Sequence, residues 1–191
     1  MITLEGNWVE GYAFDIHTVS SEYQGEDDFG HSQYNTIRTE MGELVYQLKY
    51  QDNPAVVNKI VDLLQNIKGL NKMDVIIPIP PSNQDRTNQP VYSIATELGC
   101  RFGITVYLDA LGKSKESKEL KEITDPEKRQ EALKNAMHIA KNYDLSNKNI
   151  LLIDDLYRSG ATLKVATELL YSKTKAKKIY VLTMTKTRTN R

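Results

Sequence analysis

Short apolar runs alternate along the chain with longer segments in which apolar residues recur every three or four positions. The short runs are typical of buried strands, and the longer segments are typical of amphipathic helices. The predicted strands lie at residues 12–16, 74–79, 104–108, 149–153 and 178–185, and the predicted helices at residues 42–50, 54–64, 91–99 and 163–170. Strands that alternate with helices predict an α/β fold with a central parallel sheet flanked by helices.

Two segments lack such a pattern. Residues 20–35 are polar, acidic and bear glycine, which favours a loop. Residues 111–130 are dense in lysine and glutamate and contain Gly112 and Pro126. We therefore expect residues 1–41 to form a small N-terminal hood segment and residues 42–191 to form the main domain.

The composition narrows the class of protein. The hydrophobic fraction is 40%, enough for a packed core, and no apolar run approaches the roughly 20 residues of a membrane span. The N-terminus shows no secretory signal pattern. Cys100 is the only cysteine, so an internal disulfide and an all-cysteine zinc site are excluded. We expect a cytoplasmic protein that does not contact membranes.

The net charge is zero but unevenly distributed. Residues 1–70 hold 4 basic and 11 acidic residues, a net charge of −7, and residues 71–191 hold 21 basic and 14 acidic residues, a net charge of +7. A neutral total argues against direct nucleic-acid binding, and a basic C-terminal part is compatible with an anionic small ligand. Charges scattered over solvated faces would give the same numbers.

Residues 150–163 carry the most informative chemistry. The predicted strand ends in the adjacent carboxylates Asp154 and Asp155, and ligands bind at the carboxyl ends of parallel strands. A turn with Gly160 then opens a helix, whose first N–H groups lack partners and suit a phosphate. The two carboxylates can bind sugar hydroxyl groups, and the turn beside them can bind a phosphate. This combination matches a phosphorylated ribose. A Rossmann-like or receiver-like domain with a chance acidic pair is the alternative.

This segment resembles the PRPP motif of type I phosphoribosyltransferases, where four apolar residues precede two acidic residues, a small-residue turn and a threonine. The resemblance implies that the acidic pair binds the ribose hydroxyls of 5-phosphoribosyl 1-diphosphate (PRPP) and that the turn wraps its 5-phosphate. The PRPP-binding residues that it implies are Asp154, Asp155, Leu156, Tyr157, Arg158, Ser159, Gly160, Ala161 and Thr162.

One position departs from the 6-oxopurine transferases of that family. They carry an aspartate that serves the purine where this chain has Arg158. A guanidinium cannot accept a proton as a carboxylate does. We therefore disfavour hypoxanthine and guanine as acceptors.

A proline-bearing loop after the strand at residues 74–79 is followed by an arginine and an Asn-Gln pair. This order resembles the competence-protein ComF branch of the same fold, and residues 42–50 resemble that branch's helix before the first core strand. The resemblance covers roughly residues 42–188, but residues 1–41 lack the cysteine cluster of many ComF-like proteins. By itself the loop is also consistent with an ordinary turn. The diphosphate-binding residues implied by the resemblance are Pro80, Pro81, Ser82 and Arg86.

The charged stretch at residues 111–130 lies where type I enzymes carry a mobile loop that closes over PRPP. Lysines there, including Lys113, could place positive charge near the leaving diphosphate. Interleaved glutamates fit a solvated, partly helical loop equally well. The predicted catalytic residues are Asp154, Asp155, Lys115 and Lys118.

The resemblance implies a phosphoribosyltransferase that binds PRPP with Mg²⁺, mainly through PRPP itself, and transfers the phosphoribosyl group to an unknown nitrogen acceptor. A homodimer is implied because many relatives are dimers. The alternatives are a non-catalytic PRPP-binding regulator and a ComF-like factor in DNA uptake or processing. Aromatic residues at Trp8, Tyr12 and Phe14 could stack on an acceptor base or simply belong to the core.

Overall fold

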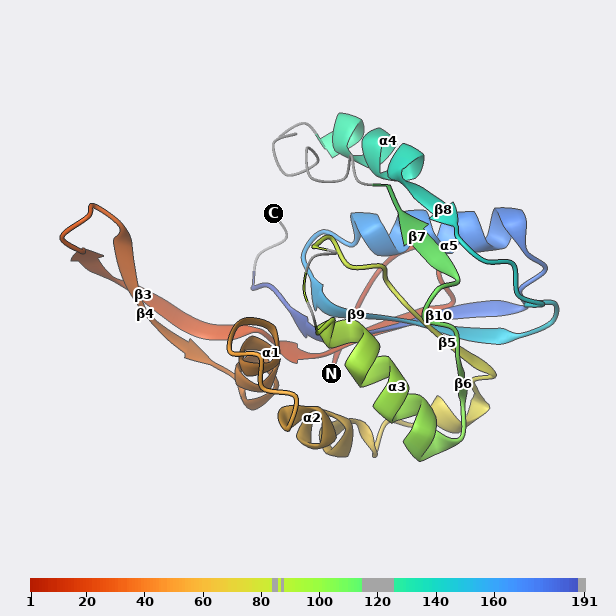
Figure 1. Ribbon diagram of the computed structural model, residues 1–191, viewed down its shortest axis with the longest axis horizontal. Coiled ribbons are helices and arrows are strands. Elements are labelled where there is room, and N and C mark those ends of the chain that lie inside the picture. Colours follow the sequence, from red (N-terminus) through yellow and green to blue (C-terminus); the bar gives the residue numbers. More distant parts are fainter. Residues whose placement is uncertain (84–85, 87, 115–125, 189–191) are drawn as a thin grey trace.

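The computed structural model describes residues 1–83, 86, 88–114 and 126–188, and of residues 126, 127, 129 and 130 only the backbone. Within these residues a six-stranded sheet has the order β1-β2-β10-β9-β5-β6 (Figure 1). All neighbouring strands are parallel except β1 and β2. The strands are β1 (Ile2–Thr3), β2 (Glu10–Ile16), β5 (Val75–Pro78), β6 (Thr105–Val106), β9 (Asn149–Tyr157) and β10 (Lys178–Lys186).

Helices cover both faces of this sheet (Figure 1). One face packs against α1 (Glu40–Tyr50), α2 (Val56–Leu64) and α3 (Pro90–Phe102). The other face packs against α5 (Ala161–Lys173), α4 (Pro126–Ala136) and a small antiparallel pair, β7 (Leu111–Lys113) and β8 (Met137–Ile139). A short 3-10 helix, Leu70–Lys72, leads into β5. The predicted α/β class is therefore confirmed.

The central strands are apolar throughout because both of their faces are buried. Ile76, Leu151 and Ile153 face the α1–α3 layer, whereas Ile77 and Leu152 face the α4–α5 layer, and the exposed fraction of each is 4% or less. This two-sided burial explains why the strands appear in the sequence as continuous apolar runs. None of the helices in the described residues has the length and apolar character that a membrane crossing requires.

Near its end, β9 is paired with β10 but no longer with β5. β9 pairs with β10 as far as Tyr157, opposite Lys186, but it pairs with β5 only as far as Ile153, opposite Pro78. Asp154 therefore lies just beyond the last pair with β5, at the carboxyl edge of the sheet. This is the edge at which ligands bind in open α/β sheets.

Helix α1 is tied to the end of β2. The Thr39 hydroxyl donates to the carbonyl of Ile16 (2.6 Å) and accepts from the backbone N–H of Gly42 (3.0 Å), which caps the helix. At Gly42 a Cβ atom would lie 2.1 Å from the carbonyl oxygen of His17. Only glycine lets the helix approach the strand this closely.

The predicted loop at residues 20–35 is wrong. The segment forms a β-hairpin of β3 (Thr18–Glu26) and β4 (Ser32–Arg38), which extends away from the carboxyl edge of the sheet (Figure 1). Most of its side chains are exposed. The alternation of buried and exposed residues that marks a strand packed on a core is therefore weak, so the sequence of these strands resembles that of a loop.

The N-terminal strands belong to the main sheet. Trp8 is 7% exposed and its indole N–H donates to the Leu4 carbonyl, while Tyr12 and Phe14 pack against the cluster on the α1–α3 face. These aromatic side chains therefore contribute to the core rather than to an open stacking surface. The division of the chain at residue 41 stays a prediction.

We predict that Gly42→Ala destabilises the protein, because its methyl group must displace the His17 carbonyl or the helix. The free energy of unfolding should fall by about 1–3 kcal/mol, as in other overpacked sites. Urea unfolding measures the change, with Gln47→Ala in the same helix as the control. Equal stability of Gly42→Ala and the wild type would show that the close approach is not tight.

Candidate functional site

The acidic pair occupies the sixth and seventh of the nine positions of β9. Asp155 is 9% exposed and Asp154 is half-buried. The backbone N–H of Asp155 donates to Asp154 Oδ1 (2.8 Å), and the carbonyl of Asp155 accepts from the Thr185 hydroxyl on β10 (3.1 Å). His17 Nδ1 lies 3.1 Å from the same hydroxyl. The ends of β9, β10 and β2 thus hold the pair from one side.

Lys49 forms an ion pair with Asp155. Its Nζ lies 2.6 Å from Asp155 Oδ2, and the two side chains are 24% and 12% exposed. Lys49 sits on α1 beside Leu48, at the border of the helix's apolar face. Sequence reasoning missed this role, because a lysine beside an apolar stripe usually buries only its aliphatic stem and keeps its charge in water.

Lys113, at the end of β7, is a second cation near the pair. Its side chain is largely buried, and this desolvation lowers the pKa of its ammonium group, whereas the negative charges of Asp154 and Asp155 act in the opposite sense. The expectation that Lys113 places positive charge near a leaving diphosphate stays a prediction. In the structure its charge interacts with Asp154 and Asp155.

The pKa of Asp154 is raised to about 7 from its ordinary 3.8. Desolvation of the charged carboxyl is the main cause, and repulsion by Asp155 is the second. Lys113 and, more weakly, Lys49 act against this shift. A titratable group with a strongly perturbed pKa at the carboxyl edge of a sheet is a frequent property of functional sites.

The turn after β9 leads into α5. Gly160 has a φ of 76°, in the left-handed region, and a Cβ atom there would lie 2.6 Å from the ring of Tyr157. Glycine is therefore required at this turn for two reasons. Arg158 and Ser159 are exposed, and Ala161 and Thr162 start α5, where backbone N–H groups of a first helical turn lack helical partners.

Two predicted residues of the PRPP motif have limited access. Tyr157 is 7% exposed and packs in the core on the α4–α5 face, and Leu156 is half-buried. These two residues would therefore contribute to ligand binding through their backbone groups or by fixing the conformation of the turn.

The proline-bearing loop lies beside the acidic pair. The N–H of Ile79 donates to the Ile153 carbonyl (2.9 Å), so the loop leaves the sheet next to Asp154. Pro80 is buried, Pro81 is half-buried and Ser82 is exposed. The two segments that the sequence singled out are thus brought to one edge of the sheet.

The Asn-Gln pair after this loop braces it. The Gln89 amide donates to the carbonyls of Asn83 (2.9 Å) and Arg86 (3.1 Å), and the Asn88 amide donates to Asp52 (2.7 Å). The guanidinium of half-buried Arg86 lies 5.6 Å from the centre of the Tyr50 ring. The predicted catalytic residues Lys115 and Lys118 lie outside the described residues.

The family model of the phosphoribosyl transferase domain matches residues 47–189. The chain belongs to this family. None of the curated protein sequences compared with it matches significantly.

Several solved structures are similar. A hypoxanthine phosphoribosyltransferase from Staphylococcus aureus is 19% identical at a TM-score of 0.42, over 69% of this chain and 63% of that one. Orotate phosphoribosyltransferase from Aeropyrum pernix is 11% identical (TM-score 0.41), over 82% and 69%. Glutamine phosphoribosylpyrophosphate amidotransferase from B. subtilis is 15% identical (TM-score 0.47), over 82% and 34%. The chain thus spans less than two thirds of the length of the Staphylococcus aureus enzyme.

We predict that Lys49→Met lowers the free energy of unfolding by about 2–3 kcal/mol, because Asp155, which is largely buried, would lose its ion-pair partner. Lys59→Met, at an exposed position of α2, removes the same charge and serves as the control. Urea unfolding at neutral pH measures both. Equal stability of the two variants would contradict a structural role for the ion pair.

The raised pKa of Asp154 predicts a pH-dependent stability. Between pH 3.8 and about 7 the folded protein retains a proton that the unfolded chain has released. The contribution of this group to stability is therefore complete below pH 3.8 and is lost as the pH rises to about 7.

Asp154→Asn should remove this loss. Relative to the wild type, the variant should become more stable from pH 4 to pH 8 by up to roughly 4 kcal/mol. Denaturant unfolding of both proteins at each pH measures the difference. A difference that does not change with pH would show that the Asp154 carboxyl titrates normally.

Proposed function

We propose that this protein is a phosphoribosyltransferase that binds PRPP together with Mg²⁺ at the carboxyl edge of its sheet and releases diphosphate. The observation that carries the proposal is the acidic pair of β9, with Asp154 half-buried and Asp155 buried, which is followed by the glycine turn of α5 and flanked by the loop after β5 that the Gln89 amide holds. These three features provide groups for a ribose, a phosphate and a diphosphate on one edge.

The reaction would be a displacement at the anomeric carbon of PRPP. The lone pair of a nitrogen acceptor forms the new carbon–nitrogen bond, the bond to the diphosphate oxygen breaks, and diphosphate leaves with the electron pair. The acceptor nitrogen then releases a proton. The protein contributes mainly by positioning the reactants and by stabilising developing charge.

Each part of the site has a distinct role in this proposal. Asp154 and Asp155 accept hydrogen bonds from the ribose hydroxyls. The backbone and hydroxyl groups of residues 158–162 surround the 5-phosphate at the start of α5. Residues 80–82 and Arg86 contact the diphosphate, and the roles of Lys115 and Lys118 at the leaving group stay predictions.

The donor set fits a magnesium ion that is shared with the substrate. Within the described residues, no three acidic, histidine or cysteine side chains converge on one point. Two carboxylates at one edge suit Mg²⁺, which keeps few protein ligands and is commonly completed by phosphate oxygens. When bound, the ion would neutralise charge on the diphosphate.

The N-terminal segment would contribute the hood through the base of the β3–β4 hairpin. Arg38, at this base, stacks on Tyr46 of α1 with its guanidinium 3.7 Å from the ring centre. His17, which precedes β3, lies next to the Thr185 hydroxyl that holds Asp155. The acceptor would therefore approach between the hairpin base and the acidic pair.

We also assign the chain to the ComF-like branch. The support is the order of proline-bearing loop, Arg86 and the Asn88-Gln89 pair, and the bracing contacts of this pair give the pattern a structural reason. A role in DNA uptake does not follow from this assignment.

We predict that PRPP with Mg²⁺ raises the melting temperature of the wild-type protein, because a ligand bound only by the folded state stabilises it. The double variant Asp154→Asn/Asp155→Asn should lose this response, since charged acceptors for hydroxyl groups contribute roughly 1.5–3 kcal/mol each. Asp28→Asn, in the distant hairpin turn, should respond as the wild type does.

Thermal unfolding with PRPP and Mg²⁺, with PRPP and a chelator, and with ribose 5-phosphate distinguishes the contributions of metal and diphosphate. No shift of the wild type at millimolar PRPP with Mg²⁺ would overturn the proposal. A screen of bases and amines for PRPP-dependent diphosphate release then tests turnover. Binding without release from any acceptor would favour a PRPP-binding regulator.

A further inference from the structure

The β3–β4 hairpin exposes an unusual amount of apolar surface. Of the nine large hydrophobic side chains exposed among the described residues, five lie on this hairpin: Val19, Tyr23, Phe29, Tyr34 and Ile37. Tyr23 and Tyr34 face each other across the strands, with ring centres 5.6 Å apart. The hairpin extends away from the body of the protein (Figure 1). A two-stranded hairpin is only marginally stable in water by itself, so a partner surface would stabilise it.

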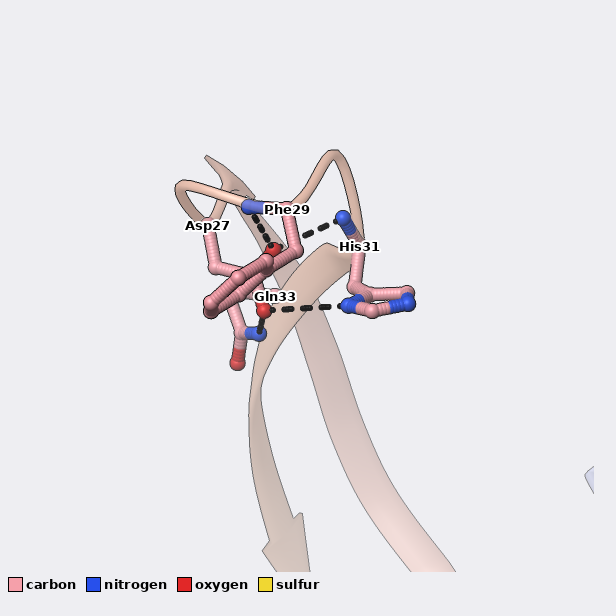
Figure 2. A network of polar contacts seen from close by, with 4 residues as sticks. All are labelled: Asp27, Phe29, His31 and Gln33. Carbon is pink, nitrogen blue, oxygen red and sulfur yellow. Dashed lines mark hydrogen bonds and ion pairs between the residues drawn. The ribbon is translucent and has the colours of Figure 1, made fainter.

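The Asp27 carboxylate organises the tip of the hairpin, together with backbone hydrogen bonds of Asp27 to Gly30 and His31. Asp27 Oδ1 accepts from the backbone N–H groups of Phe29 (2.9 Å) and His31 (2.8 Å), and Oδ2 accepts from the Gln33 amide (3.1 Å) (Figure 2). His31 Nδ1 lies 3.3 Å from Oδ2. This network fixes the backbone on both sides of Phe29, whose side chain is 85% exposed. A fixed backbone lowers the entropic cost of placing an aromatic anchor in a partner.

The charge of the hairpin selects among partners. Residues 18–38 contain Glu22, Glu26, Asp27 and Asp28 but only one basic residue, Arg38. Glu26 and Asp27 immediately precede the turn that carries Phe29, and Asp28 lies within it. Two such tips would repel each other, so the complementary surface should be basic and should offer an apolar floor.

The opposite end of the protein has such a surface. A cavity of about 410 Å³ lies at the amino edge of the sheet, between the segment that leads into β9 and the end of α5. Its lining includes the apolar Ile139 and Leu145, the acidic Asp144, and the basic Lys141, Lys173 and Lys175. Lys141 forms an ion pair with Asp109 (3.4 Å), so the complementary charge comes mainly from Lys173 and Lys175. A second cavity, of about 520 Å³ against α3, has Glu97 and no lysine or arginine in its lining, so it does not complement the tip.

We propose that the tip of the β3–β4 hairpin, with Phe29 as the apolar anchor, docks in the lysine-lined cavity at the amino edge of a second copy of this chain. The acidic tip meets the rim of Lys173 and Lys175, and the phenyl ring meets the floor near Leu145. In this arrangement the acidic N-terminal part of one copy contacts the basic C-terminal part of the next copy. Such a contact joins two different surfaces, so it builds a ring or a chain of copies.

This arrangement makes a specific prediction about two complementary variants. Phe29→Ala has a defective tip and an intact cavity, whereas Lys173→Glu/Lys175→Glu has an intact tip and a defective cavity. Each variant alone should be monomeric at concentrations where the wild type associates. Mixed in equal amounts, they should form a 1:1 dimer, because one functional tip and one functional cavity remain.

Analytical ultracentrifugation of the wild type, each variant and the mixture measures these states. Val9→Ala, a surface apolar truncation, and Lys59→Glu/Lys72→Glu, an equal charge change on other exposed lysines, are the matched controls and should associate as the wild type does. Melting temperatures confirm that each variant is folded, and a variant that unfolds is replaced by Phe29→Leu or by Lys173→Gln/Lys175→Gln.

The proposal is overturned if the wild type stays monomeric at high protein concentration. It is also overturned if the lysine variant self-associates as the wild type does, which would indicate that hairpins pair with one another, or if the mixture stays monomeric. Because the test does not involve PRPP, its outcome is independent of the proposed enzymatic activity.

Discussion

The structure of the carboxyl edge of the sheet depends on two carboxyl groups near the end of β9 that are largely shielded from solvent. Burial of the second, Asp155, is tolerated because Lys49 reaches it from α1, and α1 can do so because Gly42 lets the helix lie against the end of β2. The first, Asp154, keeps a higher proton affinity than an ordinary aspartate. Helix, strand and turn are thereby held in one arrangement around the acidic pair.

The surrounding elements divide into a rigid support and an exposed set of ligand groups. The buried apolar strands β5, β9 and β10 fix the positions of their own carboxyl ends. The Gln89 amide fixes the loop that follows β5. The groups that would meet a ligand, among them Ser82, Arg158 and Ser159, lie on the turns beyond these strand ends and are exposed. A rigid sheet that presents loops at its carboxyl edge is the general arrangement of α/β binding sites.

The features that the sequence predicts correctly are those with a strong local signal. Continuous apolar runs indicate β5 and β9. The acidic pair and the glycine turn that follows it indicate the carboxyl edge of the sheet. Lys49 was missed because its partner is 106 positions away in the chain. The hairpin was missed because it buries little surface, so the alternation that indicates a strand is weak there.

The most direct test of the site is diffraction from crystals grown with PRPP and Mg²⁺. The account predicts the 5-phosphate within hydrogen-bond distance of the backbone N–H groups that open α5. It also predicts the ribose hydroxyls on Asp154 and Asp155, and the diphosphate beside the loop at residues 80–82. Ligand density at another surface, or an empty carboxyl edge in crystals saturated with PRPP and Mg²⁺, would contradict it.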